Sequence, residues 1–458
     1  MNTDTIAAIA TGLSNGGISI IRISGSDTFS IIDRIYRSKS GKKILSKEKS
    51  HTIHYGFIVD GDEVIDEVMV TIMRTPLSYT KEDTVEINCH GGIVITRRVL
   101  EVVLKNGARL AEPGEYTKRA FLNGRIDLSQ AEAVCDLINA KNELSLKNSV
   151  NQLQGKLKKR IQEQRDIIIR DIAMIEAALD DPEHMSLDGF SEILLEHVET
   201  EIKVIDKLIE DSRNGRIIKE GIKTVILGKP NAGKSSLLNA LLGEDRAIVT
   251  DIAGTTRDTL EETINLAGIT LNIVDTAGIR NTEDLVEKIG VDKAISYAKE
   301  ADLIIYVVDS STDLDDSDKE ILKLIENKKA IILLNKSDLE SKVTKDMLSQ
   351  ETEQPIINTS VIEDYGIDKL IDQIKDMFFS GEISFNDDIY ITNERHRAAL
   401  LDTMESLKMV KQSILDDMPE DFYSIDLMNA YEALGRIIGE NVDDDLIDTI
   451  FREFCMGK

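Results

Sequence analysis

The spacing of apolar residues divides the chain into segments with two different periods. Residues 1–118 contain short apolar runs, such as 18–23 and 84–89, whose composition and length predict strands. An Asp-Gly pair within 57–64 predicts a hairpin, and residues 93–105, which end before a glycine, predict a helix. Together these elements predict a compact α+β domain at residues 1–118.

From about residue 119 the apolar residues recur every three or four positions, which is the spacing of amphipathic helices. A one-sided apolar stripe has to be buried against a partner helix, and the stripes of 119–217 find such partners only in 381–458. The pattern therefore predicts a discontinuous α-helical bundle domain made from both segments. Ser129 with Glu132 predicts a capping box at the start of its first helix. The predicted stripe residues are Val134, Leu137, Ile138, Val150, Leu153, Leu157, Ile161, Ile168, Ile172, Ile175, Leu179, Leu194, Val198, Ile202, Ile205 and Ile209, with Leu400, Met404, Leu407, Leu427, Ala430, Leu434, Leu446, Ile450 and Phe454 in the second segment.

Residues 218–380 are predicted to form a third domain, inserted into the helical one. Apolar runs alternate there with helical segments, which is the pattern of a mainly parallel sheet covered by helices. Residues 340–354 are polar and predict a loop-rich segment. The predicted strands lie at 224–227, 271–274, 303–308, 330–334 and 355–357.

A phosphate-binding loop begins directly after the first of these strands. Residues 228–235 fit the pattern G-x-x-x-x-G-K-[ST], and a helical segment follows them. Backbone N–H groups at a helix N-terminus hold a triphosphate, and a glycine-rich turn lets them approach it closely. Lys234 is then expected to reach the β- and γ-phosphates, and the Ser235 hydroxyl is expected to bind Mg²⁺.

The identity of the base is predicted by residues 335–338, Asn-Lys-Ser-Asp, at the end of the strand 330–334. The Asp338 carboxylate can accept hydrogen bonds from the N1–H and 2-amino groups of guanine, and adenine offers neither donor. This motif alone is commonly a surface turn. In order behind the phosphate loop, with Asp-Thr-Ala-Gly at 275–278 between them, it predicts a GTP-binding domain of Ras-like α/β fold.

The segment 250–258 carries Thr256, which is predicted to be a second Mg²⁺ ligand that registers the γ-phosphate, although a Thr-Thr pair also occurs in plain turns. Asp275 is expected to hold the Mg²⁺ shell, and the N–H of Gly278 to contact the γ-phosphate. Ile279 stands where many GTPases place a water-orienting glutamine, so hydrolysis needs another residue and another positive charge. The candidates are Arg257, Arg280, Glu283, Glu287 and Lys288.

Composition restricts the compartment and the partners. Of 458 residues 30% are charged and the net charge is -28, which argues against broad, non-specific binding to nucleic acid or anionic membranes. Three widely separated cysteines, Cys89, Cys135 and Cys455, predict no disulfide framework and a reducing cytosol. No run reaches about 18 apolar residues and the N-terminus has no targeting pattern, so a cytoplasmic protein without a membrane partner is expected.

The motifs together resemble the MnmE (TrmE) family of tRNA-modifying GTPases over essentially the whole chain. The resemblance rests on 228–236, on Asp-Ile-Ala-Gly-Thr-Thr-Arg-Asp at 251–258, on the terminal Phe-Cys-Met-Gly-Lys, and on the N-terminal segments 22–25, 90–92, 113–115 and 120–123. It implies a homodimer joined through the N-terminal domains, in a heterotetramer with an FAD-dependent partner. It further implies that an aminomethyl-type group, such as carboxymethylaminomethyl, is formed on C5 of the wobble uridine of tRNA. The one-carbon unit would come from 5,10-methylenetetrahydrofolate or 5-formyltetrahydrofolate.

The resemblance also implies roles for single residues. K⁺ would be held by the side chains of Asn231 and Thr255 and the carbonyls of Thr250 and Ile252, and would supply the charge that an arginine finger supplies elsewhere. Glu287 would position the attacking water. The nucleotide contacts so predicted are Asn231, Ala232, Gly233, Lys234, Ser235, Ser236, Thr250, Thr255, Thr256, Asp275, Thr276, Ala277, Gly278, Asn335, Lys336, Asp338, Ser360 and Val361.

For the N-terminal domain the resemblance implies folate contacts from Arg22, Glu86, Arg125 and the terminal Lys458. A carboxylate suits the N–H groups of a pterin, and cations suit the anionic glutamyl tail. The plain alternative for Arg22 and Glu86 is an ion pair on the surface of a sheet. Cys455, beside the tail, is a candidate reactive thiol, with a small buried apolar residue as its alternative.

Two other functions remain open at this point. A regulatory GTPase of ribosome assembly would carry the same GTPase motifs without one-carbon chemistry, and would not bind a reduced folate. A folate-dependent aminomethyl transferase with an incidental nucleotide-binding insert would modify its substrate independently of GTP.

Overall fold

The computed structural model describes residues 4–181, 183–184, 189–243, 262–266, 268–274, 297–379, 390–452, 454 and 457. Two compact units make up the chain. The first consists of Met1–Ile138, Gln152–Leu194 and Met409–Lys458, and the second of Asn139–Asn151 and Leu195–Lys408. Each unit therefore combines segments that are far apart in the sequence.

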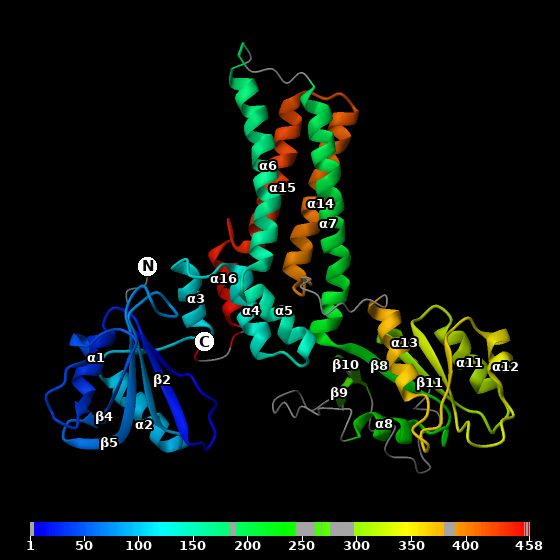
Figure 1. Ribbon diagram of the computed structural model, residues 1–458, viewed down its shortest axis with the longest axis horizontal. Coiled ribbons are helices and arrows are strands. Elements are labelled where there is room, and N and C mark those ends of the chain that lie inside the picture. The colour runs from blue at the N-terminus through cyan, green and yellow to red at the C-terminus, as the bar shows by residue number, and fades with distance from the viewer. Residues whose placement is uncertain are drawn as a thin grey trace. The chain divides into compact units, whose positions relative to one another are not determined.

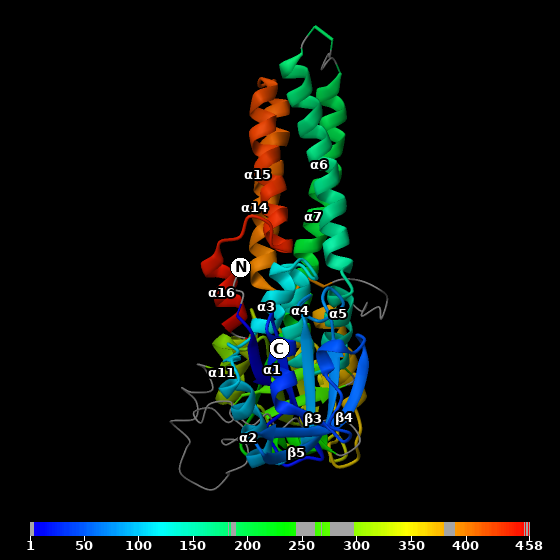
Figure 2. The same ribbon diagram turned by 90° about the vertical axis from the view of Figure 1, so that its left-hand side faces the viewer.

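A seven-stranded sheet forms the N-terminal part of the first unit, with the strand order β3-β4-β5-β6-β2-β1-β7 (Figures 1 and 2). All neighbouring strands are antiparallel except β1 and β7. Helices α1 (Thr28–Ile35) and α2 (Ile93–Lys105) cover one face, where Ile21, Ile87 and Val99 are fully buried. The predicted hairpin is confirmed between β4 and β5. The strands are β1 Ile6–Ile9, β2 Ile18–Ser24, β3 Tyr36–Ser38, β4 Thr52–Asp60, β5 Glu63–Met73, β6 Thr84–His90 and β7 Arg109–Leu110, with a short 3-10 helix at Leu45–Lys47.

Helices from both ends of the chain complete the first unit. Helix α6 (Lys156–Asp180) packs along α15 (Glu420–Ile438), and the two lie side by side in Figures 1 and 2. Near the sheet, α3 (Glu115–Leu122) and α4 (Leu128–Ile138) share an apolar cluster with α16 (Asp444–Arg452), in which Phe451 is buried. The far C-terminus thus packs on the helices that follow the N-terminal sheet, as the sequence pattern predicts for the helical segments. Helices α5 (Glu143–Leu153), α7 (Phe190–Glu220) and α14 (Glu394–Leu415) lie mostly in the second unit.

Three local predictions are wrong. Helix α4 begins one residue before Ser129, because Asp127 and Gln130 cap it reciprocally: Asp127 Oδ1 accepts from the Gln130 N–H at 2.9 Å, and Gln130 Oε1 accepts from the Asp127 N–H at 3.1 Å. Ile138, Leu179 and Leu446 are 43%, 47% and 43% exposed, since each falls off the packed side of its helix. The polar stretch 340–354 contains helix α12 (Lys345–Glu351), whose start is capped by the Thr344 hydroxyl.

The second unit contains a six-stranded sheet with the order β13-β12-β11-β8-β10-β9. Every neighbouring pair is parallel except β9 and β10. The parallel strands therefore end at one edge of the sheet, which is where open α/β sheets bind ligands. The elements are β8 Ile222–Leu227, α8 Lys234–Leu242, β9 Glu262–Leu266, β10 Ile269–Ile273, β11 Leu303–Asp309, α11 Asp316–Ile325, β12 Ala330–Asn335, β13 Ile356–Asn358 and α13 Ile367–Phe379.

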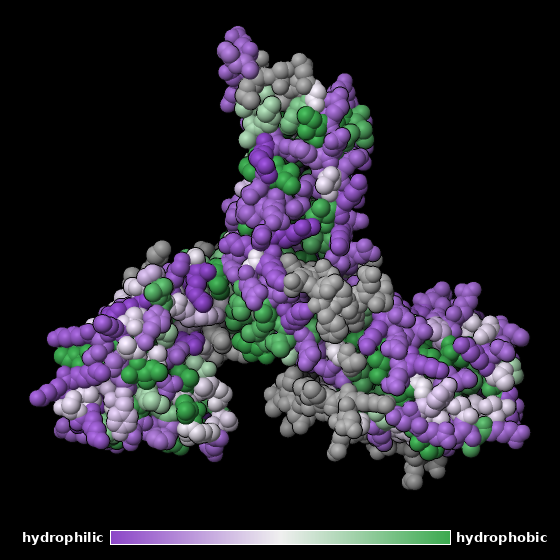
Figure 3. All heavy atoms as spheres, in the orientation of Figure 1, coloured by the Kyte–Doolittle hydropathy of each residue, from purple (hydrophilic) through white to green (hydrophobic). Residues whose placement is uncertain are grey.

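The outer surface of the helices is largely polar. Figure 3 shows hydrophilic residues spread over the long helices, with apolar residues scattered among them. Among the described helices, none has an apolar stretch long enough to pass through a membrane.

Candidate functional site

The phosphate loop joins β8 to α8, and its backbone shape requires glycine at two positions. Gly228 has φ +150°, and a Cβ there would lie 2.5 Å from the carbonyl oxygen of Val307 in β11. Gly233 has φ +105°, and a Cβ there would lie 2.1 Å from the Asn335 side chain. Asn231, at φ +61°, also takes the left-handed conformation. The loop is thus pressed against two neighbouring strands, which leaves no room for side chains at its glycines.

Lys234, the first residue of α8, folds back over the loop. Its Nζ donates to the carbonyl oxygens of Gly228 at 2.8 Å and Lys229 at 2.7 Å. Burial lowers the pKa of the Lys234 ammonium, because the nearby partners are neutral carbonyls. An anion bound at this helix N-terminus would give the Lys234 ammonium a negatively charged partner.

The base-recognition loop is joined to the phosphate loop through one amide side chain. Asn335, at the end of β12, is buried and donates from Nδ2 to the Ala232 carbonyl at 2.9 Å. Its Oδ1 accepts from the Val361 N–H at 3.3 Å. Asp338 accepts a hydrogen bond from the Ser360 hydroxyl at 2.7 Å, so the two predicted base-loop segments, 335–338 and 360–361, are held together.

These residues surround a hollow of about 300 Å³ at the carboxyl edge of the sheet. Ile362 lines it and was not predicted, because it lies in the turn after Val361 and an apolar residue there fits no nucleotide-binding motif. Asp309 was also missed: it ends β11 and pairs with Lys336 at 2.5 Å. Its position directly after an apolar run, the same signal that identified 335–338, would have found it. The predicted residues that line the hollow are Asn231, Gly233, Lys234, Ser235, Ser236, Asn335, Lys336, Asp338 and Val361.

Part of the predicted site lies outside the described residues. The positions concerned are Thr250, Ile252, Thr255, Thr256, Arg257, Asp275, Thr276, Ala277, Gly278, Ile279, Arg280, Glu283, Glu287, Lys288, Cys455 and Lys458.

In the N-terminal sheet, Arg22 of β2 and Glu86 of β6 are direct cross-strand partners. Arg22 Nε donates to Glu86 Oε1 at 2.9 Å, so the ion pair that was the plain alternative is present. Arg22 also lies over the rings of Tyr79 and Tyr116, and Arg125 lies 4.7 Å from the centroid of Tyr79. The structure therefore places Arg22 and Arg125 over the Tyr79 ring, with Glu86 paired to Arg22.

The end of the chain reaches the same place. The carbonyl of Gly457 accepts from Arg22 Nη1 at 3.1 Å. Gly457 has φ +86°, and a Cβ there would lie 2.4 Å from the Ile9 carbonyl oxygen in β1. Phe454 is buried against the turn at Gly114, which fixes the approach of the tail.

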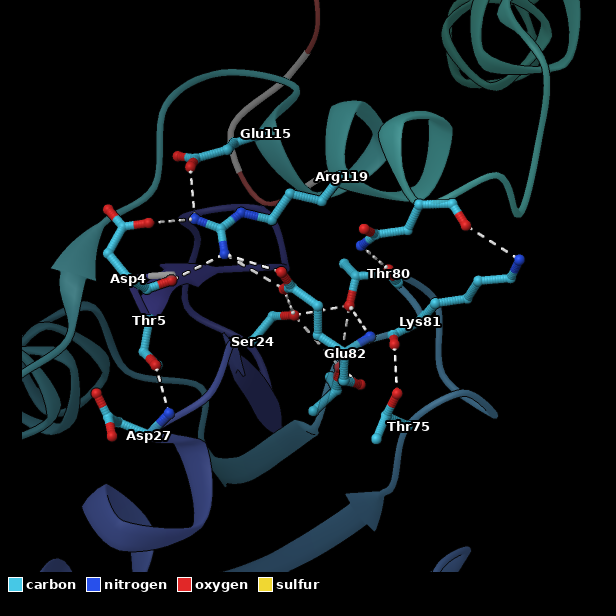
Figure 4. A network of polar contacts seen from close by, with 12 residues as sticks. Asp4, Thr5, Ser24, Asp27, Thr75, Thr80, Lys81, Glu82, Glu115 and Arg119 are labelled. Carbon is cyan, nitrogen blue, oxygen red and sulfur yellow. Dashed lines mark hydrogen bonds and ion pairs between the residues drawn. The ribbon is translucent and has the colours of Figure 1, made fainter. Parts of the chain in front are cut away.

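A charged network holds the loop that carries Tyr79 (Figure 4). Arg119 of α3 is only 7% exposed in its side chain and donates to Asp4 and Glu115 at 2.9 Å and to Glu82 at 3.2 Å. Glu82 also accepts from the Ser24 hydroxyl at 2.7 Å. The network joins the start of the chain, the loop between β5 and β6, and helix α3.

Comparison with known proteins identifies the family. Residues 5–125 match the family model described as the GTP-binding protein TrmE N-terminus, and residues 128–455 match that of the MnmE helical domain. The chain belongs to the MnmE family. Membership confirms the predicted family, the GTPase enzyme class and the fold class of N-terminal α+β, discontinuous helical and inserted Ras-like α/β parts.

Several MnmE relatives match over their whole length. The tRNA modification GTPase MnmE of Lachnoclostridium phytofermentans is 64% identical over 458 residues, which is 100% of both chains. That of Bacillus subtilis is 46% identical over 459 residues, covering 99% of this chain and 100% of the relative. Among solved structures, the G domain of the T. maritima FeoB iron transporter is 28% identical over 34% of this chain and 98% of its own, with a TM-score of 0.26.

Proposed function

We propose that this MnmE-family chain is a K⁺-dependent GTPase that modifies tRNA in the cytoplasm. As a homodimer, in a heterotetramer with an FAD-dependent partner, it forms an aminomethyl-type group, such as carboxymethylaminomethyl, on C5 of the wobble uridine. Residues 1–118 bind the folate and dimerise, residues 119–217 and 381–458 form the helical domain, and residues 218–380 bind and hydrolyse GTP.

The observation that carries the GTP assignment is the amide of Asn335, which hydrogen-bonds both the phosphate loop at Ala232 and the base loop at Val361. A nucleotide that reaches from one loop to the other therefore meets a preassembled site. Lys234 at the N-terminus of α8 suits a phosphate, and the Asp338 carboxylate suits the two N–H donors of guanine.

The described residues fit the proposed cations as oxygen donors. Ser235 lines the hollow beside Lys234 and offers a hydroxyl, a ligand that Mg²⁺ prefers. Asn231 lies at the edge of the hollow with an exposed side chain and offers an amide oxygen for K⁺. Bound K⁺ would place positive charge near the phosphates. Thr256 is proposed as the second Mg²⁺ ligand, Thr250, Ile252 and Thr255 as the other K⁺ ligands, and Glu287 as the water-positioning residue.

The N-terminal groups fit a reduced folate. Glu86 retains 22% exposure beside Arg22, so the carboxylate is open to the N–H groups of a pterin. The guanidinium groups of Arg22 and Arg125, which both lie over the Tyr79 ring, suit an anionic glutamyl tail. Lys458 follows Gly457, which contacts Arg22, and is proposed as a further cation of this site.

The face of the N-terminal sheet opposite α1 and α2 is proposed for dimerisation. Tyr55 of β4 and Met69 of β5 are cross-strand partners on this face and are 46% and 50% exposed, and Ile53 is 65% exposed. Exposed apolar residues that share one face of a sheet are typical of a protein interface.

Turnover of GTP is expected to depend on the identity of the monovalent cation. We expect a rate on the order of a hundredfold higher in KCl than in NaCl at equal ionic strength, because the loss of one electrostatic contact to the reacting phosphate lowers kcat by about 100- to 1000-fold. The affinity for a fluorescent GDP, measured under both conditions, is the control. Equal turnover in the two salts would contradict the K⁺ assignment.

The decisive test of the tRNA function is mass spectrometry of the wobble uridine in tRNA from cells that lack this chain. The C5 modification is expected to disappear and to return when the intact chain is supplied. Return is expected to fail with a Lys234→Ala chain, because the proposed contact of Lys234 with the phosphates would be lost. Full modification in the deleted strain would refute the proposal.

A further inference from the structure

Lys229 is the second residue of the phosphate loop, yet its side chain is tied to a different element. Its Nζ lies 2.7 Å from Asp315 Oδ2 and 2.5 Å from Asp318 Oδ2, at the N-terminus of α11. Burial disfavours the ammonium, but the hydrogen bonds and charges of the two carboxylates outweigh it and raise the pKa of Lys229. Lys229 is thus a charged link between the phosphate loop and α11.

The carboxylates that receive Lys229 are themselves fixed. Asp318 is 3% exposed in its side chain, and its Oδ1 accepts from the buried Tyr306 hydroxyl at 2.5 Å. Asp318 Oδ2 also accepts from the Asp315 N–H at 2.9 Å, within the capping box of α11. Tyr306 pairs in register with Leu227, the last residue before the phosphate loop. The anchor therefore belongs to the same rigid sheet from which the loop emerges.

The link acts on the part of the loop that receives Lys234. The carbonyl oxygens of Gly228 and Lys229 accept both hydrogen bonds from Lys234. The peptide that supports Lys234 is thus held by the Lys229 side chain. Lys336 of the base loop is tied in the same way to Asp309, so the segment 309–318 restrains a lysine from each nucleotide-binding loop.

We propose that Lys229 is a positioning residue for guanine nucleotides: through Asp315 and Asp318 it fixes the floor of the phosphate loop and so strengthens the binding of GTP and GDP alike. This inference rests on the proposed GTP function. The effect reaches both nucleotides because their α- and β-phosphates occupy the same loop. Loss of the Lys229 side chain is expected to change kcat little, because this side chain points to α11 and not to the reacting phosphate.

The test is nucleotide binding and turnover by Lys229→Ala in the full-length chain. The Kd for a fluorescent GDP and the KM for GTP are each expected to rise about tenfold, with kcat changed less than about threefold, a split that marks lost binding common to ground and transition states. Lys229→Arg, which retains the charge and the reach, is expected to restore Kd to within about threefold. Asp318→Asn, which keeps an acceptor for Tyr306, is expected to weaken binding similarly, and the double variant no further.

The matched control is Lys342→Ala, which breaks an exposed ion pair with Asp313 of the same segment but leaves Asp315 and Asp318 intact, and is expected to leave Kd unchanged. Three results would each overturn the inference. Lys229→Ala could leave Kd unchanged, Lys229→Arg could fail to restore binding, or the losses of affinity from the substitutions at positions 229 and 318 could be fully additive in the double variant. If Lys229→Ala does not fold, the Asp318→Asn affinity decides. A parent chain that binds no guanine nucleotide would instead refute the proposed function.

Discussion

Asp338→Asn is expected to weaken GTP binding by on the order of a thousandfold and to create binding of xanthosine triphosphate. The carboxylate accepts from two donors of guanine, and an asparagine amide would turn an N–H₂ group toward them, which leaves buried donors unpaired. Xanthine carries an oxygen where guanine carries the amino group, so the same amide can donate to it. The hydrogen bond from Ser360 is expected to hold the side chain at position 338 in place in the parent and in Asp338→Asn alike.

Competition against a fluorescent GDP measures both affinities in the intact chain. Ser360→Ala is the matched control: it removes one hydrogen bond to the charged Asp338 carboxylate, so a loss on the order of tenfold is expected, without a change of preferred base. An Asp338→Asn chain that binds GTP as tightly as the parent would show that the base lies elsewhere.

Arg119→Ala is expected to destabilise the region around α3 by about 3–5 kcal/mol, the usual cost of removing one partner of a buried ion pair. The guanidinium contacts Asp4, Glu82 and Glu115, and the substitution would leave the buried Glu115 with fewer partners (Figure 4). Hydrogen exchange of the amides in Glu115–Leu122, followed by mass spectrometry of the intact chain, measures the local free energy of opening.

The same network predicts the direction of the pH dependence. Burial alone would raise the pKa of Glu115, but hydrogen bonds from Arg109, the Glu112 N–H and Arg119 outweigh it and lower the pKa below its ordinary value of 4.5. The Glu115 carboxyl therefore holds its proton less tightly in the folded state than in the unfolded state. The stabilisation is complete above pH 4.5 and is lost as the pH falls through the lowered pKa.

When the pH is lowered from 7, the α3 amides of Arg119→Ala are expected to lose less protection from exchange than those of the parent. The reason is that the hydrogen bond and the charge of Arg119, which help to lower the pKa of Glu115, are absent from the variant. The control is Lys105→Ala, which breaks an ion pair with Asp60. The Lys105 side chain is 67% exposed, so this substitution is expected to change amide exchange near α3 little. Equal protection of α3 in Arg119→Ala and the parent would contradict the role of the network.

Secondary structure with a strong local signal was predicted well. The helix at 93–105 and the strand at 84–89 reappear as α2 and β6, because their apolar periods and flanking glycines act within the segment itself. Short elements such as β1 and β3 were missed. They are stabilised by pairing with strands that are distant in the sequence, and four residues such as 6–9 carry little pattern of their own.

The amino-acid sequence alone indicated the chemistry of the phosphate and base loops, since each loop is a contiguous motif whose backbone and side-chain requirements are local. It also determined that helices from the two ends of the chain must pack together, because their apolar stripes have no other partner. The folded structure was needed to find the strand register that pairs Arg22 with Glu86, the contact of Gly457 with Arg22, and the ion pair between Lys229 and Asp318. These contacts join residues far apart in the chain, and no local pattern encodes which distant partner a buried charge will meet.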